Sequence, residues 1–270
     1  MGQVRVGVSG WSYPHWRGDF YPPGLRQRDE LQWCAERMGA IELNASFYAL
    51  QRPTSYAAWR DVLPPGVELA VKGSRFITHL RKLRDVEVPL ANFLASGLLA
   101  LGDALGPVLW QLPERLSFDP DRMEAFLDLL PRSTARAAEV AARHDDRLAD
   151  DRALTTATVD RPLRHVLEPR HPSFGEPAAL ALLRRHGVGC VVADSAQRWP
   201  QLDAVTSDVV HVRLHGEGEL YAGGYSPGSL DRWAERCRAW AREADVYVFF
   251  DNDARGRAPW DALALQERLS

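Results

Sequence analysis

The stretch Arg164-His165-Val166-Leu167-Glu168-Pro169-Arg170-His171-Pro172 is an apolar run that ends in charged residues. The run around Val166 predicts a short buried strand. The two prolines fix φ at about −65° and remove backbone donors, so we expect the strand to end in a rigid turn. Glu168, Arg170 and His171 then lie together at its carboxyl end. Such a group is typical of a functional site, although an ion pair that closes a barrel rim would have the same sequence.

The same pattern recurs along the whole chain. The predicted strands are residues 4–9, 41–44, 68–73, 108–112, 164–168, 189–194, 209–215 and 246–251, and the predicted helices include 28–38, 53–63, 90–105, 178–186, 230–242 and 259–269. Eight strands that alternate with helices over about 250 residues predict an α/β fold, a single (β/α)8 TIM-type barrel spanning residues 1–270. A doubly wound open sheet is the competing fold, but its glycine fingerprint is missing after the first strand.

Composition narrows the class of protein. Hydrophobic residues make up 46% of the chain and charged residues 26%, which is ordinary for a globular protein. We expect no membrane partner and no signal peptide, because the longest apolar stretch is interrupted by polar residues and glycines. Cys34, Cys190 and Cys237 lie far apart and form no CxxC pair, so reduced thiols in a cytoplasmic protein are predicted. The oligomeric state is not determined by these features.

In a barrel, the residues that follow each strand share one face, where such enzymes carry their sites. The polar and aromatic residues at these positions are Ser9, Trp11, Glu42, Asn44, Lys72, Thr78, His79, Gln111, Glu168, Arg170, His171, Asp194, Arg213, His215, Asp251, Asn252 and Asp253. The opposite strand ends carry fewer, for instance Arg5, Glu68 and Asp208. The asymmetry predicts a ligand or catalytic site at the C-terminal face, with a network of mutually satisfied charges as the alternative.

The residue types at this face suit an anionic ligand. Lys72, Arg170 and Arg213 are cations that bind phosphate or carboxylate groups. Glu168 or Glu42 is the candidate general base, and His171 or His215 the candidate acid. The further candidates are Asp194 for catalysis and Asn44, His79, Gln111, Trp11, Tyr48 and Asn252 for ligand binding.

Two further interpretations stay open. The carboxylates together with His79, His171 and His215 are a possible site for a divalent metal, but no HxH or HExxH spacing supports it. The aromatic residues of loop 11–21, with Phe47, Tyr48, Tyr221 and Tyr225, can form a stacking wall for a base or a sugar. Alternatively, these loops pack on themselves.

Several dispersed motifs resemble one family from end to end. They are Gly7-Val8-Ser9-Gly10-Trp11-Ser12-Tyr13, Ile41-Glu42-Leu43-Asn44-Ala45-Ser46-Phe47-Tyr48, Ile77-Thr78-His79, Gln111-Leu112-Pro113, Glu168-Pro169-Arg170-His171-Pro172-Ser173-Phe174, Arg213-Leu214-His215-Gly216 and Asp251-Asn252-Asp253. The chain resembles the domain of unknown function 72 (YecE-like) family. The resemblance implies a TIM-type barrel of cytosolic bacterial type without an established activity. Looser kinship with apurinic-endonuclease and xylose-isomerase barrels suggests phosphodiester or sugar chemistry.

This chain departs from the family pattern at three positions. The family more often has Asn at 251, an aromatic residue at 169 and Trp at 174, where this chain has Asp251, Pro169 and Phe174. The extra negative charge of Asp251 would either bind a metal or pair with Arg213.

Together these features support one leading hypothesis and two alternatives. The leading hypothesis is an enzyme acting on an anionic, possibly phosphorylated ligand, either a nucleic-acid fragment or a sugar phosphate, by a reaction such as phosphoester hydrolysis. The first alternative is a non-catalytic module that binds nucleic acid or a partner through the aromatic loop after the first strand. The second is a metal-free sugar isomerase.

Overall fold

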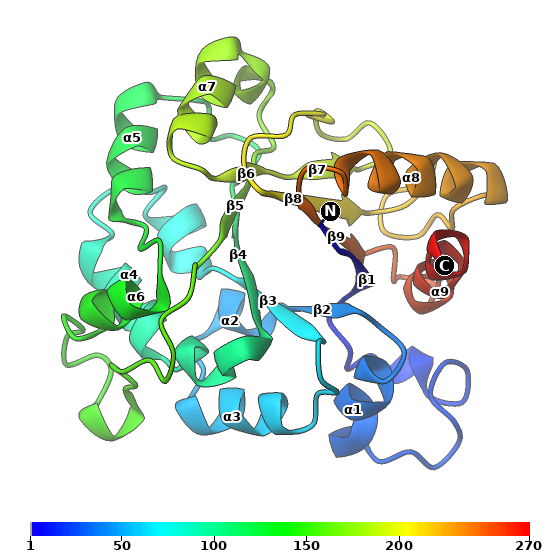
Figure 1. Cartoon of the computed structure of the whole chain (residues 1–270), viewed down its shortest axis with the longest axis horizontal. Helices are drawn as coiled ribbons and strands as arrows, with labels where there is room; N and C mark the ends of the chain where they lie inside the picture. Colours follow the sequence, from blue (N-terminus) through cyan, green and yellow to red (C-terminus); the bar gives the residue numbers. More distant parts are fainter. Residues whose placement is uncertain (1) are drawn as a thin grey trace.

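A computed structural model describes residues 2–270 as one nine-stranded sheet, in the order β6-β5-β4-β3-β2-β1-β9-β8-β7. All neighbouring strands are parallel. The strands are β1 (Val4–Ser9), β2 (Ala40–Leu43), β3 (Glu68–Lys72), β4 (Leu105–Gln111), β5 (His165–Glu168), β6 (Gly189–Cys190), β7 (Val192–Asp194), β8 (Val209–Leu214) and β9 (Asp245–Phe250). They surround a common axis with the helices outside (Figure 1). The prediction of a TIM-type barrel is confirmed.

The barrel closes at residues 189–194, which the sequence predicts as one strand. The structure divides this segment into β6, which pairs with β5, and β7, which pairs with β8. Only Val191 separates them, and its N–H donates to the carbonyl of Leu167 over 2.9 Å. One continuous piece of chain therefore bonds to both edges of the sheet, so nine strands make a ring of eight chain segments.

Helices cover the outside of this ring. They are α1 (Glu30–Ala35), α2 (Ala45–Tyr48), α3 (Pro53–Asp61), α4 (Glu87–Ala95), α5 (Pro120–Leu129), α6 (Thr134–Ala141), α7 (Pro177–Arg185), α8 (Pro227–Trp240) and α9 (Ala258–Leu269). Capping residues define several of their starts. The Asp119 carboxylate accepts from the backbone N–H of Arg122, and Ser133 and Ser226 cap α6 and α8 in the same way.

Because side chains alternate between the two faces of each strand, the apolar residues form two separate regions. The barrel interior holds a small cluster, and a larger one lies between the sheet and the helices. The interior cluster consists of Ala40, Ala70, Leu109, Val166, Val191, Val209, Tyr247 and Phe249. Small residues on β1 to β3 leave room for the two large rings on β9. Gly7 shows how tight this packing is, because a Cβ there would lie 1.7 Å from the carbonyl oxygen of Ala40.

The prediction of one helix over residues 90–105 is wrong. α4 ends at Ala95, Gly97 adopts a φ of 118°, and a 3-10 segment leads into β4, which begins at Leu105 rather than at 108. A Cβ on Gly97 would lie 2.5 Å from the Cα of Pro53, so only glycine fits this reversal. Apolar residues on both sides of the break pack on the same core, which hides the break from periodicity. The predicted helix 28–38 is also shorter, with a 3-10 turn before α1.

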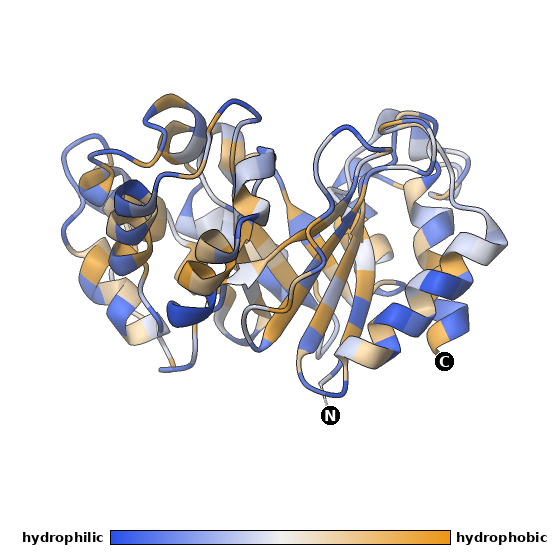
Figure 2. Ribbon diagram, turned by 90° about the horizontal axis from the view of Figure 1, so that it is seen from above, coloured by the Kyte–Doolittle hydropathy of each residue, from blue (hydrophilic) through white to orange (hydrophobic). Residues whose placement is uncertain are grey.

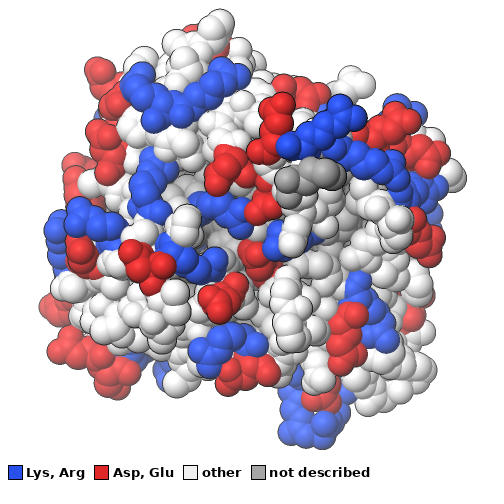
Figure 3. All heavy atoms as spheres, viewed as in Figure 1, with Lys and Arg blue, Asp and Glu red and all other residues white. Residues whose placement is uncertain are grey.

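The two ends of the barrel differ in their charges. Figure 2 shows the N-terminus at the lower edge and the strands rising toward loops at the upper edge. On the lower face, acidic and basic side chains are interspersed (Figure 3). Arg5 pairs with Glu68 at 3.0 Å and Arg164 with Asp245 at 2.7 Å, and the Tyr247 hydroxyl donates to Glu68. These pairs satisfy one another at the starts of the strands, where barrels carry stability rather than catalysis.

The three cysteines do not pair with one another. Cys34, Cys190 and Cys237 are free and buried. In the described chain, residues 2–270, no helix is long and apolar enough to cross a membrane.

Candidate functional site

The polar residues of the barrel mouth form the last inward layer of the strands. Each lies two residues, or four for Arg213, beyond an inward apolar one: Glu42 after Ala40, Lys72 after Ala70, Gln111 after Leu109, Glu168 after Val166, His211 and Arg213 after Val209, and Asp251 after Phe249. Because side chains of a strand alternate between faces with a period of two, these groups all point into the barrel. The structure therefore brings residues from six strands to one place.

Arg213 is the centre of this layer and is only 1% exposed. Its Nη2 lies 2.8 Å from Glu42 Oε1 and 3.1 Å from Asp251 Oδ2, and its Nη1 lies 3.0 Å from Glu168 Oε2. Nε also donates to Glu42, and Nη2 to the hydroxyl of Ser9. All three guanidinium nitrogens are thus occupied within the protein. Arg213 holds three carboxylates in place and has little capacity left to bind a ligand anion.

The carboxylates around Arg213 are held in the ionised state. Glu168 also accepts from Gln111 over 2.8 Å and from Arg170 over 3.2 Å. Burial raises the pKa of Glu168, but the charges of Arg213 and then Arg170 outweigh it and keep the pKa well below its usual range. Burial of Glu42 is outweighed in the same way, mainly by Arg213, so its pKa is also lowered. Carboxylates that are stabilised so strongly are weak bases, which disfavours the predicted role of either as general base.

Lys72 stands apart in this layer because it lacks a counter-charge. Its side chain is 8% exposed, and residues 2–270 place no carboxylate within ion-pair distance of its amine. The nearest described partner is the ring of Phe47, whose centroid lies 4.6 Å from Nζ. Burial, followed by the charge of Arg213, lowers the pKa of Lys72 from 10.5 to about 8. Lys72 is therefore a cation of the mouth whose proton is exchanged closer to neutral pH than that of an ordinary lysine.

A histidine lies on the same ring. Phe47 contacts His79 edge-on, with centroids 5.2 Å apart, and the His79 Nδ1 lies 2.9 Å from the Thr78 hydroxyl. His79 belongs to a π-helical turn, Phe76–Leu80, a form that often marks functional sites. Burial and then the charge of Arg170 lower its pKa to about 4, so its imidazole is neutral at pH 7. Tyr48, in contrast, is 69% exposed at the outer edge of this wall.

Arg170 forms the opposite wall. Its guanidinium donates from Nε and Nη2 to one oxygen of Glu168 and stacks on Trp199 at 3.6 Å. In residues 2–270 its Nη1 makes no hydrogen bond, so this nitrogen is free for a ligand. A cavity of about 880 Å³ opens beside it and is lined by Trp199, Asp194 and Glu217 among others. This volume is within the usual range for small-molecule sites.

Two residues of the mouth, His211 and Trp199, were not among the sequence candidates, and Tyr221 was predicted only as part of a stacking wall. His211 is fully buried, with Nε2 3.4 Å from Glu42, and its position two residues before Arg213 on β8 is the signal that could have found it. Trp199 and Tyr221 lie in loops, where no periodicity points to the site. Tyr221 has a φ of 64° and packs edge-on against His215, whose Nδ1 lies 3.0 Å from Asp251.

Some predicted residues make their contacts elsewhere. The His171 ring caps its own turn, with Nδ1 2.8 Å from the Ser173 hydroxyl. Asn252 donates to Asp261 and to a loop carbonyl. Asp194 accepts from the Tyr225 hydroxyl over 3.2 Å, and burial raises its pKa. These three residues lie beside the Arg213 layer rather than in it.

Asn44 and the aromatic loop complete the rim. The Asn44 amide donates to Ser9 over 2.9 Å, and its Oδ1 is buried without a partner. Trp16 and Tyr21 are fully buried and pack against each other, so the loop after β1 largely packs on itself. Trp11 is half-buried and lies edge-on against Trp59 at 5.9 Å. The loop offers little open ring surface for stacking a base.

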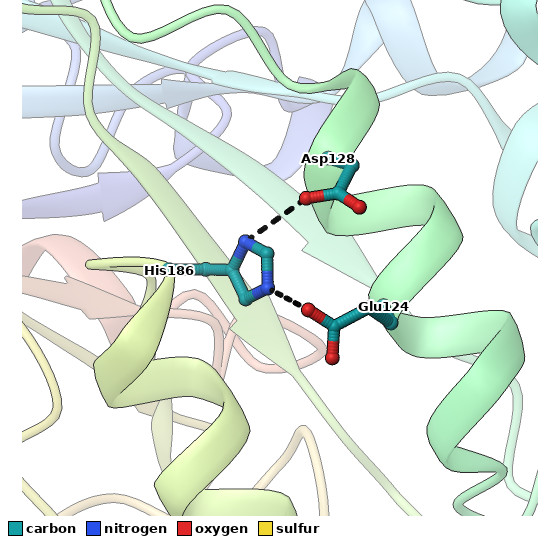
Figure 4. A group of neighbouring side chains, drawn as sticks. All are labelled: Glu124, Asp128 and His186. Carbon is teal, nitrogen blue, oxygen red and sulfur yellow. Dashed lines mark hydrogen bonds and ion pairs between the residues drawn. The ribbon is translucent and has the colours of Figure 1, made fainter.

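The donor set of the mouth does not fit a divalent metal. The three carboxylates that converge there already enclose the guanidinium of Arg213, and Asp251 pairs with it rather than standing free. The metal-type group found in residues 2–270 is Glu124, Asp128 and His186, on α5 and just after α7. Figure 4 shows the two ring nitrogens of His186 facing different carboxylates, at 2.8 Å and 3.7 Å. Such a ring bridges two acids between helices, outside the barrel.

Comparison with known proteins places the chain in a family. A family model described as "Protein of unknown function DUF72" matches residues 5–270. UPF0759 protein YecE of Escherichia coli (strain K12) is 26% identical, over 98% of this chain and 92% of its own. A DUF72 family protein of Thermotoga maritima MSB8 has a TM-score of 0.77 at 24% identity, with 99% of each chain covered. D-Psicose 3-epimerase of Clostridium cellulolyticum H10 shares the fold alone, with a TM-score of 0.53 at 11% identity, over 100% of this chain and 98% of that one. The chain belongs to the DUF72 family, as its dispersed motifs predict.

Proposed function

We propose that the chain is an isomerase- or epimerase-type enzyme that moves a proton beside the carbonyl group of a small anionic sugar derivative. The proposal rests on Lys72, an amine that is buried at the end of β3 without a carboxylate partner in residues 2–270 and has a pKa of about 8. Desolvation and a neighbouring cation are the conditions under which lysine acts as a base or nucleophile near neutral pH.

The proposed step uses three residues of the mouth: Lys72, His79 and Arg170. Lys72 takes the proton from the carbon beside the carbonyl, and the electron pair of that C–H bond moves onto the carbonyl oxygen. The neutral imidazole of His79 donates a hydrogen bond to this developing oxyanion. Return of the proton by Lys72 to the former carbonyl carbon, while His79 passes the proton of the neighbouring hydroxyl to the oxyanion, gives the isomer. Delivery of a proton from water to the opposite face of the original carbon, while the oxyanion re-forms the carbonyl and Lys72 releases its proton to water, gives the epimer. The unbonded Nη1 of Arg170 holds the anionic substituent.

Phosphoester hydrolysis is less well supported by the same geometry. It would require a carboxylate as general base or metal ligand, and Glu42, Glu168 and Asp251 all accept from Arg213. The fold is compatible with the epimerase proposal, because a barrel named as a D-psicose 3-epimerase has the same architecture. A shared fold is no evidence of a shared reaction, so the argument depends on Lys72.

The proposal can be tested by hydrogen exchange in D2O. A panel of aldose and ketose phosphates, with their unphosphorylated counterparts, is followed by loss of the proton NMR signal beside the carbonyl. We expect exchange with a phosphorylated member and a rate at least about 100-fold lower in Lys72→Met, since general-base catalysis contributes about 10²–10⁴-fold. Arg170→Gln should raise KM more than it lowers kcat. Undiminished exchange in folded Lys72→Met, or none with any panel member, would refute the proposal.

A second measurement needs no substrate. The chain contains two lysines, Lys72 and Lys82, so protein labelled with 13C at lysine Cε gives two assignable side-chain signals. We expect one of them to titrate with a pKa of about 8 and to disappear in Lys72→Met. Lys82→Arg assigns the other. A Lys72 signal that titrates at its ordinary value of 10.5 would remove the basis of the proposed base.

A further inference from the structure

A pocket lined by cations lies outside the barrel mouth, between the loops that follow β3 and β4. Its volume is about 380 Å³, and its lining consists of Arg81, Lys82, Arg84, Arg115, Leu116, Ser117 and Arg122. Five of these side chains are positively charged, and the lining contains no carboxylate. The chain as a whole has a net charge of −3, so this is a local accumulation of positive charge and not a general property of the surface.

Most of this charge is uncompensated. Arg81 pairs with Asp85 at 3.0 Å and Arg122 with Asp119 at 2.8 Å. Within residues 2–270, no carboxylate lies within ion-pair distance of Lys82, Arg84 or Arg115, and all three are exposed. Elsewhere on this chain about half of the exposed arginines that the structure describes have an acidic partner, such as Arg136 with Glu139 and Arg255 with Glu219.

The loop that carries the pocket is held in an unusual shape. Lys82, Leu83 and Asp85 have φ values of 50°, 68° and 49°, a region that residues other than glycine rarely adopt. Leu83 is 3% exposed and anchors the loop in the core, and the guanidinium of Arg81 donates to the carbonyl of Arg84. Strained backbone of this kind persists only where the surroundings fix it, and it occurs preferentially where side chains are positioned for binding.

We propose that this pocket binds a phosphate group, either of a phosphorylated small molecule or of a nucleic-acid backbone. Several guanidinium groups around one small space match the oxygens of a phosphate, which accepts paired N–H donors. Arg122, in the first turn of α5, lines the same pocket. Arg115 follows Gln111 of the mouth by four residues in the loop after β4. The phosphate site does not depend on the proposed reaction, because no residue of the pocket takes part in that chemistry.

The test compares two double variants of equal charge. Arg84→Ala with Arg115→Ala removes two unpaired cations of the pocket. Arg184→Ala with Arg242→Ala removes two exposed arginines near the C-terminal ends of α7 and α8, at the opposite end of the barrel, and serves as the control. Binding is measured at 50 mM salt by fluorescence anisotropy with a labelled ten-residue oligothymidylate and by calorimetry with inorganic pyrophosphate.

We expect the wild type and the control to bind at least one probe, and the pocket variant to bind it at least about tenfold more weakly. If the oligothymidylate binds, the pocket variant should lower the slope of log K against log salt by about 1.4, because two phosphate contacts are lost. Binding of pyrophosphate alone assigns the pocket to a small phosphate ester, and binding of the oligothymidylate assigns it to nucleic acid. Equal affinities of the two double variants, or no binding of either probe to the wild type, would overturn the proposal.

Discussion

Replacement of Arg213 by Met tests whether the barrel mouth is organised around this guanidinium. The substitution keeps a long side chain but removes the cation from three carboxylates that lie 2.8 to 3.1 Å from it. Glu42 and Glu168 are fully buried, so neither can regain its solvation from water. Removing one partner of a buried ion pair costs about 3–5 kcal/mol. Because two buried carboxylates lose their partner together, we expect a loss of about 5 kcal/mol or more at pH 8.

The stability of Arg213→Met should change with pH, and in the opposite direction from the stabilisation that Glu42 and Glu168 provide in the wild type. In the wild type the folded-state pKa of Glu42 and of Glu168 is lowered, so their stabilisation is present above the unfolded pKa of about 4.3 and is lost only in strong acid. Without Arg213, we expect burial to outweigh the partners that remain, His211 and Lys72 at Glu42 and Arg170 and His215 at Glu168, so the folded-state pKa of these carboxyls rises above the unfolded value. The variant is then stabilised by protonation in acid and loses that stability as pH rises. Each pH unit over which one carboxyl behaves in this way changes the free energy of unfolding by about 1.4 kcal/mol.

The measurement is urea unfolding at pH 5.5, 6.5 and 8.0, followed by far-ultraviolet circular dichroism. We expect the difference between wild type and Arg213→Met to grow by about 3 kcal/mol over this range, which corresponds to about two pH units of one titrating carboxyl. The control is Arg136→Met, which breaks an exposed pair with Glu139 and should cost less than about 1 kcal/mol at every pH. A loss below about 1 kcal/mol for Arg213→Met at pH 8, or a difference independent of pH, would refute the reasoning.

Two further predictions concern buried bases. Lys72→Met should stabilise the protein at pH 7 by up to about 3 kcal/mol, because the pKa of Lys72 is lowered to about 8, so the unfolded chain holds its proton more tightly between pH 8 and 10. The gain should fall to about 1 kcal/mol at pH 10 in thermal melts, and equal melting temperatures at pH 7 would contradict it. His165, whose Nδ1 accepts from the Trp110 indole over 3.1 Å, has its pKa lowered by burial to about 4. The stability that the neutral side chain of His165 gives to the folded protein is fully present above pH 6.5, and it falls by about 3 kcal/mol toward pH 4. Urea unfolding of His165→Gln should lack this acid-side fall, and a variant with an unchanged pH profile would disprove the assignment.

The barrel and the composition of its mouth follow from patterns that the sequence displays. Alternation along β8 places His211, Arg213 and His215 on one side of the strand, and the same period carries Glu42 and Glu168 inward from the apolar residues below them. Parallel strands then force all their carboxyl ends to one face. Local patterns of this kind are enough to predict which residues come together at the mouth.

The roles of those residues depend on distances that no local rule contains. Arg213 appears in the sequence as a cation free for a ligand, but Ser9, Glu42, Glu168 and Asp251 occupy its nitrogens from strands far along the chain. Whether a charge is satisfied is decided by differences of about an ångström in side-chain position. The stack of Arg170 on Trp199 escapes prediction for a related reason, since it depends on a loop conformation. The break at Gly97 is hidden because apolar residues continue through it.

These observations assign different roles to the residues of the mouth. A metal ion would neutralise converging carboxylates and polarise nearby groups, and here the guanidinium of Arg213 occupies the position where those carboxylates converge. Its charge is also, after burial, the strongest influence that lowers the pKa of Lys72, and the carboxylates act in the opposite direction. Removal of Arg213 would therefore both release buried acids and return Lys72 toward its protonated state. One buried arginine thus connects the stability of the barrel mouth to the basicity of the amine at its edge, so the two properties should change together in any variant of position 213.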